Sequence, residues 1–298
     1  MTVRYDQLCE QVTARIVQQI ETGTAGTWRA PWHHNGTADL FCPTNATTLR
    51  PYAGANVLIL AFEALDADYS DNRWSTYRQW QSMGAQVRRG EHGTRCVKWI
   101  AKTPSADQPP DGENTARVLI PRVFTVFNAD QVDLPDEPTD TTEPALVRTE
   151  SAEAFITATG AQIDYGFNTA KYRPLVDRIQ VPAIGQYRQA EDHYATILHE
   201  LVHWTGHQSR LSRTFGERFG DDAYAVEELV AELGAAFATA RLGITNSPRS
   251  DHAAYLAHWL RILDQNPKVL FQTASSAQTA VDHLATYSRP TTQSEVAA

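Results

Sequence analysis

Cysteine is scarce in this chain of 298 residues. Its three cysteines, Cys9, Cys42 and Cys96, stand far apart, and none belongs to a Cys-x-x-Cys pair. A disulfide-stabilised secreted domain needs a denser set of cysteines, and a cysteine-based zinc site needs closely paired ones. Both are therefore excluded, and we expect each cysteine to be a reduced packing residue.

Long apolar segments are lacking as well. The longest apolar run, Asn56–Leu65, is interrupted by Glu63, and it is far shorter than the ~20 residues that a membrane-spanning helix requires. The first residues, MTVRYDQLCEQ, do not show the basic, apolar and small-residue order of a secretory signal. We therefore expect a cytoplasmic protein with no membrane partner.

An overall excess of positive charge, common in nucleic-acid-binding proteins, is also missing, because the formal net charge is −9. Of the 26 Lys and Arg and 35 Asp and Glu, residues 1–132 carry 13 and 13, which leaves 13 against 22 for the rest. Within the neutral part, Arg73–Lys98 holds six basic residues and one acid, Glu91. A local patch of this kind can follow a phosphate backbone even on an acidic protein.

The hydrophobic pattern predicts an α+β protein. Apolar residues at helical spacing predict helices early in the chain, over Tyr5–Glu21, Asn56–Leu65 and Trp74–Met83. Alternating β-forming residues predict strands over Val87–Ile100 and Arg117–Phe127.

The chain is long enough for two domains of ordinary size. The acidic, proline-containing stretch Asp133–Glu150 has the composition of a linker. It divides the chain into an N-terminal α+β domain, residues 1–132, and a mostly helical C-terminal domain, residues 151–298.

The sequence HELVH at residues 199–203 is the strongest chemical motif. His199 and His203 are one helical turn apart, so both imidazoles project from the same face of a helix and can bind one metal ion. Glu200 lies beside that face, where its carboxylate suits a metal-bound water. The motif is short and also occurs by chance on amphipathic helices, so a third ligand is needed to support a metal site.

One known spacing, HExxHxxGxxH, places the third ligand six residues after the second histidine. Gly206 fits this pattern, but the ligand position is Ser209, and His207 lies past the helix end. A second predicted helix, Tyr224–Phe237, offers Glu228 instead, and a Zn²⁺ ion held by His199, His203 and Glu228 would meet the requirement for three protein ligands.

Glu232 lies four residues after Glu228, on the same face of this helix. We expect it to orient one of the histidines from behind, or to serve as the alternative third ligand. Both glutamates could instead be solvated surface residues, and we expect Glu227 to be one.

Aromatic residues gather in the N-terminal part. Five of the seven tryptophans lie there, namely Trp28, Trp32, Trp74, Trp80 and Trp99, with Tyr52 and Tyr77 nearby. Trp74, Tyr77 and Trp80 recur at spacing three, and Arg88 and Arg89 follow. Aromatic rings alternating with cations hold unpaired nucleotides by stacking and phosphate contacts. Rings at helical spacing are also common in protein cores, so single-strand binding and core packing both remain open.

At the level of whole motifs, the chain resembles the plasmid antirestriction family ArdC and its TraC-type relatives. The resemblance runs through WRAPW (28–32), PYAGANVLIL (51–60), RWSTYRQWQSMGAQVRRGEHGT (73–94) and RVFTVFNADQVD (122–133). It continues through AKYRPLVDRIQVP (170–182), YATILHELVHWTGHQSRLSR (194–213) and YAVEELVAELGAAF (224–237). It implies an N-terminal single-stranded-DNA-binding domain joined to a zincin-like metallopeptidase domain, in a protein that shields incoming conjugating DNA from host restriction enzymes.

The resemblance also implies site residues. It makes His199 and His203 metal ligands, Glu200 the general base and Glu228 the acidic ligand, with Glu232 as the alternative. The metal is expected to be Zn²⁺, with another divalent ion possible. Residues in the matching N-terminal blocks that suit DNA contacts are Trp28, Trp32, Tyr52, Asn56, Trp74, Tyr77, Arg88 and Arg89.

Two functions follow as hypotheses. The first is a metalloprotease tethered to single-stranded DNA, acting on a protein such as a restriction-system component. The second is a non-proteolytic DNA-coating protein whose metal is structural. A nuclease or primase fits less well, because we find no aspartate cluster for two Mg²⁺ ions and no phosphate-cradling glycine loop.

Overall fold

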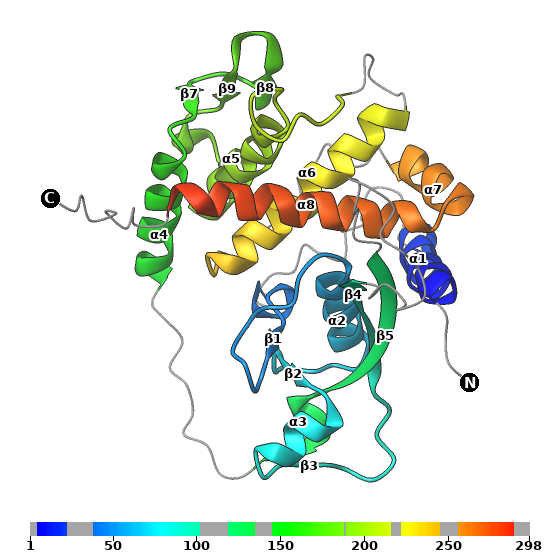
Figure 1. Cartoon of the computed structure of the whole chain (residues 1–298). Coiled ribbons are helices and arrows are strands. Elements are labelled where there is room, and N and C mark those ends of the chain that lie inside the picture. The colour runs from blue at the N-terminus through cyan, green and yellow to red at the C-terminus, as the bar shows by residue number, and fades with distance from the viewer. Residues whose placement is uncertain are drawn as a thin grey trace, which may run out of the picture.

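The structure is a computed structural model, and it describes residues 5–22, 38–101, 119–134, 145–187, 189–215, 222–244 and 256–288. Within these ranges, no helix is both long enough and apolar enough to span a bilayer. Figure 1 shows a sheet-containing part below and a helical part above, with the long helix α8 (Lys268–Tyr287) running between them.

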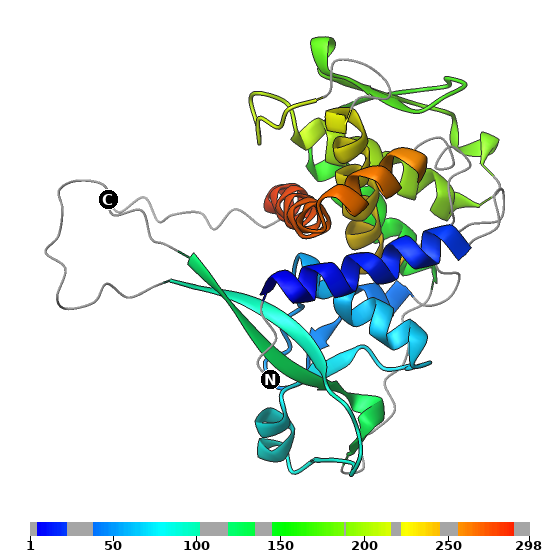
Figure 2. The same cartoon turned by 90° about the vertical axis from the view of Figure 1, so that its right-hand side faces the viewer.

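Residues 38–101 and 119–134 form the part that we call the sheet module. Its four-stranded sheet has the order β1-β2-β5-β4, and a second small sheet pairs β3 with β6. The bounds are β1 Thr44–Asn45, β2 Arg73–Ser75, β3 Gln86–Val87, β4 Thr94–Ala101, β5 Leu119–Asn128 and β6 Val132–Asp133. Helix α2 (Ala55–Asp66) packs on β4, and the short helix α3 (Tyr77–Ser82) lies near β3. Figure 2 shows the β4–β5 ribbon extending away from the helices.

The described residues between 145 and 288 form the helical module. Its helices are α4 Ala145–Ala158, α5 Ala190–Thr205, α6 Asp222–Arg241, α7 Leu256–Gln265 and α8. A three-stranded sheet of order β7-β9-β8 lies against α5, with bounds β7 Gln162–Tyr165, β8 Lys171–Arg173 and β9 Arg178–Val181. The helix α1 (Tyr5–Thr22), although first in the chain, packs on α7 and α8.

The two modules share one hydrophobic core. A single cluster of buried side chains includes Leu8, Val57 and Val97 together with Leu198 and Leu233. A polar contact also crosses the junction, because the Gly54 amide donates to the Gln278 side chain at 3.3 Å. The helix α1 is bonded to the helical module as well, since the Thr13 hydroxyl donates to the Pro267 carbonyl at 2.9 Å. The modules are therefore packed directly on each other.

Helices α5 and α6 approach each other closely at one glycine. A Cβ atom built at Gly234 would lie 2.7 Å from Cγ2 of Val202, whose side chain is fully buried. Glycine is needed there because any larger residue pushes the helices apart. This close approach brings the acidic face of α6 against the histidine face of α5.

Three sequence expectations need correction. The segment Val87–Ile100 is not one strand, because β3 ends at Val87 and β4 begins at Thr94. The segment Trp74–Met83 is not one helix, because Trp74 lies in β2 and Thr76 caps α3 through a reciprocal capping box with Gln79. The predicted linker Asp133–Glu150 is too long at its C-terminal end, because α4 begins at Ala145, while residues 135–144 lie outside the described residues.

Replacing Gly234 with valine is expected to lower the free energy of unfolding by about 1–3 kcal/mol, because extra methyl groups must displace Val202. Urea denaturation followed by circular dichroism measures this loss. Gly185→Ala is the control: Gly185 is exposed, and a Cβ atom added there would meet open space, so its effect should stay within about 0.5 kcal/mol. Equal midpoints for both variants would contradict the role of this close approach.

Candidate metal centre

Helix α5 carries both histidines of the HELVH motif. Glu191 and Asp192 lie in its first turn, where carboxylates complement the helix dipole. Leu198 and Leu201 are fully buried and fix the orientation of the helix in the core. His199 and His203 are consequently buried as well, with 3% and 8% of their surface exposed.

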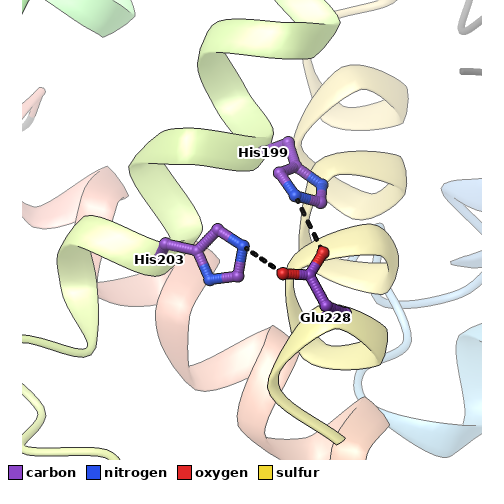
Figure 3. Close-up of side chains that lie close together, drawn as sticks. All are labelled: His199, His203 and Glu228. Carbon is purple, nitrogen blue, oxygen red and sulfur yellow. Dashed lines mark ion pairs between the residues drawn. The ribbon is translucent and has the colours of Figure 1, made fainter. Parts of the chain in front are cut away.

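Helix α6 brings a carboxylate to the histidines. Glu228 Oε2 lies 3.7 Å from Nε2 of His199, and Glu228 Oε1 lies 3.6 Å from Nε2 of His203. Figure 3 shows the three side chains pointing toward one another from the two helices. One ligand atom from each residue can be chosen so that all lie within 4.8 Å of one another.

A second carboxylate stands behind each imidazole. Nδ1 of His199 lies 3.0 Å from Oε1 of Glu232, and Nδ1 of His203 lies 3.1 Å from Oε1 of Glu227. A carboxylate at Nδ1 favours the tautomer with its proton on that nitrogen, which leaves the lone pair of Nε2 for a metal ion. The contact of His203 with Glu227 is a hydrogen bond, so His203 presents the nitrogen that faces Glu228. Glu232 approaches Nδ1 of His199 at ion-pair distance.

Arg213 holds the carboxylate behind His203. Its Nη2 and Nε donate to the two Glu227 oxygens at 2.8 and 3.0 Å, and its other donors reach Thr205 Oγ1 and the Val202 carbonyl. Burial alone would raise the pKa of Glu227, but the bonds from His203 and Arg213 outweigh burial and lower it. Glu227 thus stays ionised although only 5% of it is exposed.

Gly206 makes room for this arginine. The backbone φ at Gly206 is −75°, which any residue adopts, so conformation does not require glycine. A Cβ atom there would lie 2.7 Å from Phe215 and 2.9 Å from Arg213 Nη2. The glycine that ends α5 therefore allows Arg213 to reach Glu227.

Glu228 is strongly acidic. Burial would raise its pKa, but the adjacent His199 and His203 side chains and the Tyr224 hydroxyl outweigh burial and hold the pKa at about 2. Its side chain is 13% exposed, more than either imidazole, so the site opens to solvent on the Glu228 side. Glu200, next to His199 on α5, is buried at 3% exposure.

The donor set fits a divalent metal ion. Two imidazole nitrogens and one carboxylate oxygen are ligands that Zn²⁺ accepts, and other divalent transition metals share them. Metal–ligand bonds of about 2.1 Å place tetrahedral ligand atoms roughly 3.4 Å apart, close to the separations of 3.6 and 3.7 Å seen here. These two separations run to different oxygens of Glu228, and with one ligand atom from each residue the three atoms lie within 4.8 Å of one another, so the side chains must move closer together around an ion.

The sheet module brings three of the expected DNA-contacting residues together. Tyr77, Arg88 and Arg89 line a surface hollow of about 450 Å³. The Tyr77 ring is 41% exposed and rests edge-on against Phe127, with centroids 6.4 Å apart. Glu91 and Asp133 also line the hollow, and Glu91 pairs with Arg88 at 3.4 Å.

The other residues expected to contact DNA, where the structure describes them, pack or form hydrogen bonds within the protein. Trp74 is 1% exposed in a core cluster, so its ring faces are covered by protein, contrary to a stacking role. The Asn56 amide exchanges two hydrogen bonds with the Val97 backbone. Tyr52 is half-buried and its hydroxyl donates to the Trp74 carbonyl. Trp28 and Trp32 lie outside the described residues.

Comparison with known proteins matches each half of the chain to a family. Residues 6–127 match the N-terminal domain of the anti-restriction factor ArdC, and residues 150–276 match a zincin-like metallopeptidase family. The crystal structure of ArdC from plasmid R388 in its Mn(II)-bound form is 35% identical, covers 95% of this chain and 99% of that one, and has a TM-score of 0.74. This chain belongs to the ArdC antirestriction family.

The metal-free crystal structure of R388 ArdC gives a TM-score of 0.75 at 36% identity, over 94% of this chain and 97% of that one. The uncharacterized protein y4eC of Sinorhizobium fredii is 40% identical over 92% of this chain and 90% of its own length. Two Escherichia coli proteins named DNA primase TraC are 38% and 35% identical, but the chain spans only 28% and 20% of their lengths.

The ArdC family assignment confirms the two-domain α+β architecture expected from sequence. The expectation for Glu227 was wrong, because this residue is buried and bonded to His203 and Arg213. Arg213 was not expected at the site, because it follows the end of α5 in a segment without periodicity. His207, which the sequence places past the end of the helix, makes a hydrogen bond with Ser209, with Nδ1 2.7 Å from Oγ.

Arg213→Ala is expected to weaken divalent-metal affinity by about 10- to 100-fold, because Glu227 and through it His203 lose their fixed orientation. Competition with a metallochromic chelator measures this affinity. Arg178→Ala removes an exposed arginine that pairs with Asp164 on the β7–β9 sheet, and it should leave the affinity unchanged. Wild-type affinity in the Arg213 variant would show that this network does not position His203.

Proposed function

We propose that this ArdC-family protein is a zinc-dependent peptidase that binds single-stranded DNA and protects incoming plasmid DNA from host restriction. The observation that carries the proposal is the convergence of His199, His203 and Glu228 beside Glu200, with a carboxylate behind each imidazole. A metal ion with a purely structural role requires the three ligands but does not require Glu200 as a general base.

The reaction proposed is hydrolysis of a peptide bond. A Zn²⁺ ion held by His199, His203 and Glu228 would supply Lewis-acid activation of water and of the scissile carbonyl. Glu200 accepts the proton of the attacking water and delivers it to the leaving amine. Glu227 keeps His203 in the binding tautomer, Glu232 lies behind His199 at ion-pair distance, and the Tyr224 hydroxyl holds the Glu228 carboxylate.

An extended peptide has a place to bind next to α5. In the described part of the chain, β8 pairs with β9 on one side only, so its other edge is open for strand addition. The protein substrate proposed is a component of the restriction system, because its removal would spare the incoming DNA.

For DNA, the hollow around Tyr77 offers the two elements that an unpaired strand needs. The exposed ring of Tyr77 can stack a base, and Arg88 and Arg89 can neutralise phosphates. Since the two modules share one core, a bound strand would hold the metal centre near proteins on the same DNA, which raises their effective concentration.

The second candidate is a DNA-coating protein with a structural metal. It is favoured by the burial of Glu200, which is as complete as that of His199. Coating would protect DNA without cleavage of any protein, so the two candidates differ in what the loss of Glu200 does.

Glu200→Gln is expected to reduce peptidase turnover by at least about 100-fold, because the proton acceptor is lost, and to abolish protection in a conjugation assay with a restricting recipient. Its metal content should equal that of the wild type, because Glu200 is not a ligand. Glu191→Gln, in the first turn of the same helix, should retain protection. Full protection by the Glu200 variant would remove proteolysis from the function and favour coating.

Replacing Arg88 and Arg89 together with alanine is expected to weaken binding of single-stranded DNA and to make the dependence of affinity on salt concentration shallower, because phosphate contacts are lost. Fluorescence anisotropy over a series of salt concentrations measures both. A charge-matched control replaces Lys171 and Arg178, two exposed residues of the helical module. The same loss in both double variants, or a preference for duplex DNA, would contradict the hollow as the binding site.

A further inference from the structure

The junction of the two modules forms a cavity of about 720 Å³ that is open to solvent. Helix α8 forms one wall, and the first turn of α2 with Val97 and Trp99 of β4 forms the other. Tyr5 of α1 also lines the cavity, as does Arg213. This volume lies within the range of small-molecule and cofactor sites, which often occur where domains meet.

An aromatic platform lines the cavity. Trp99 is 52% exposed, an unusual state for a tryptophan of a packed junction. Tyr5 meets the Trp99 ring edge-on, with centroids 5.2 Å apart, and Phe271 of α8 meets Tyr5 at 5.8 Å. These contacts hold the indole in place while half of its surface stays available for a flat ligand.

The charge of the described lining residues favours one class of ligand. None of the 15 lining residues is Asp or Glu, although the chain has 35 acids in 298 residues. Among the residues that the structure describes, Arg213 is the one charged member of the lining. This charge suits a neutral or anionic ligand better than a cationic one.

Polar groups complete the lining. Gln272 and Ser276 of α8 offer amide and hydroxyl groups near the aromatic rings. Arg213 has five N–H donors, and four of them are used by Glu227, Thr205 and Val202 in the described structure. A ligand with a flat heteroaromatic part, hydrogen-bonding edges and negative charge matches this combination.

We propose that this cavity binds one nucleotide, with its base stacked on Trp99 and its phosphate on the Arg213 side. The choice of a nucleotide rests on the proposed DNA-binding function. Trp99 on β4 pairs with Pro121 on β5, six residues from Phe127 in the Tyr77 hollow, a separation of about 20 Å along the strand. One extended single strand can reach both places, so the nucleotide is either free or part of that strand.

The test uses the full chain and two probes, free dAMP and a fluorescent single-stranded oligodeoxyadenylate. Trp99→Ala should weaken binding by roughly 5- to 100-fold, as expected for loss of one base–aromatic stack, and Trp99→Phe should lose less. Ser276→Trp should block the cavity and match Trp99→Ala. Leu119→Ala, at an equally exposed apolar residue of β5 outside the cavity lining, should change nothing, and thermal melting confirms that each variant is folded.

The two probes identify the source of the nucleotide. Sensitivity of dAMP binding to Trp99→Ala and Ser276→Trp supports a free nucleotide, and sensitivity of the oligonucleotide alone supports the strand. Binding of both probes that is unchanged in these two variants overturns the proposal. Oligonucleotide binding that needs Arg88 and Arg89 but not Trp99 overturns the strand form while leaving the proposed function intact. A wild-type protein that binds neither probe overturns both.

Discussion

The metal-facing geometry depends on the carboxylate that lies behind each imidazole. Glu232 and Glu227 are buried, and burial of an ionised carboxylate costs free energy unless a cation or several hydrogen bonds compensate for it. For Glu227 the compensation is Arg213, whose remaining bonds anchor it to the last turn of α5. Arg213 thus determines the orientation of His203, although Arg213 is not one of the candidate metal ligands.

The same dependence extends to helix packing. Gly234 lets α6 approach Val202, and Gly206 leaves space for Arg213 and Phe215. Both positions require glycine because a Cβ atom would clash with neighbouring side chains, and not because of the backbone conformation. The site therefore needs a close fit between α5 and α6, and the hydrophobic core supplies the rigidity that keeps this fit.

The shared core also changes the meaning of the two-domain division. An acidic linker alone would let the modules move independently, so that tethering would depend on linker length. Instead α8 contacts both α2 and the metal-bearing helices, and α1 crosses from the N-terminal part of the sequence to pack on α7 and α8. DNA bound to the sheet module would thus stand at a defined position relative to the metal centre.

Much of the site could be predicted because helical spacing is local. The positions of His199, His203 and Glu228 follow from one turn of helix and from a second amphipathic segment. The role of Glu227 could not be predicted, because adjacent glutamates differ only in how α6 is rotated, and that rotation depends on tertiary packing. Trp74 was misassigned because a strand followed by a capped turn can place aromatics at the same spacing as a helix.

The hydrogen bond between Thr13 and Pro267 joins residues 254 positions apart. While the chain is made on the ribosome, α1 emerges long before α7 and α8 exist, so the part of its surface that packs on these two helices has no native partner for most of synthesis. Native contacts of such long range slow folding and leave nascent chains open to aggregation. The supply of chaperones during translation therefore affects how soon the folded protein is ready to act in the cell that produces it.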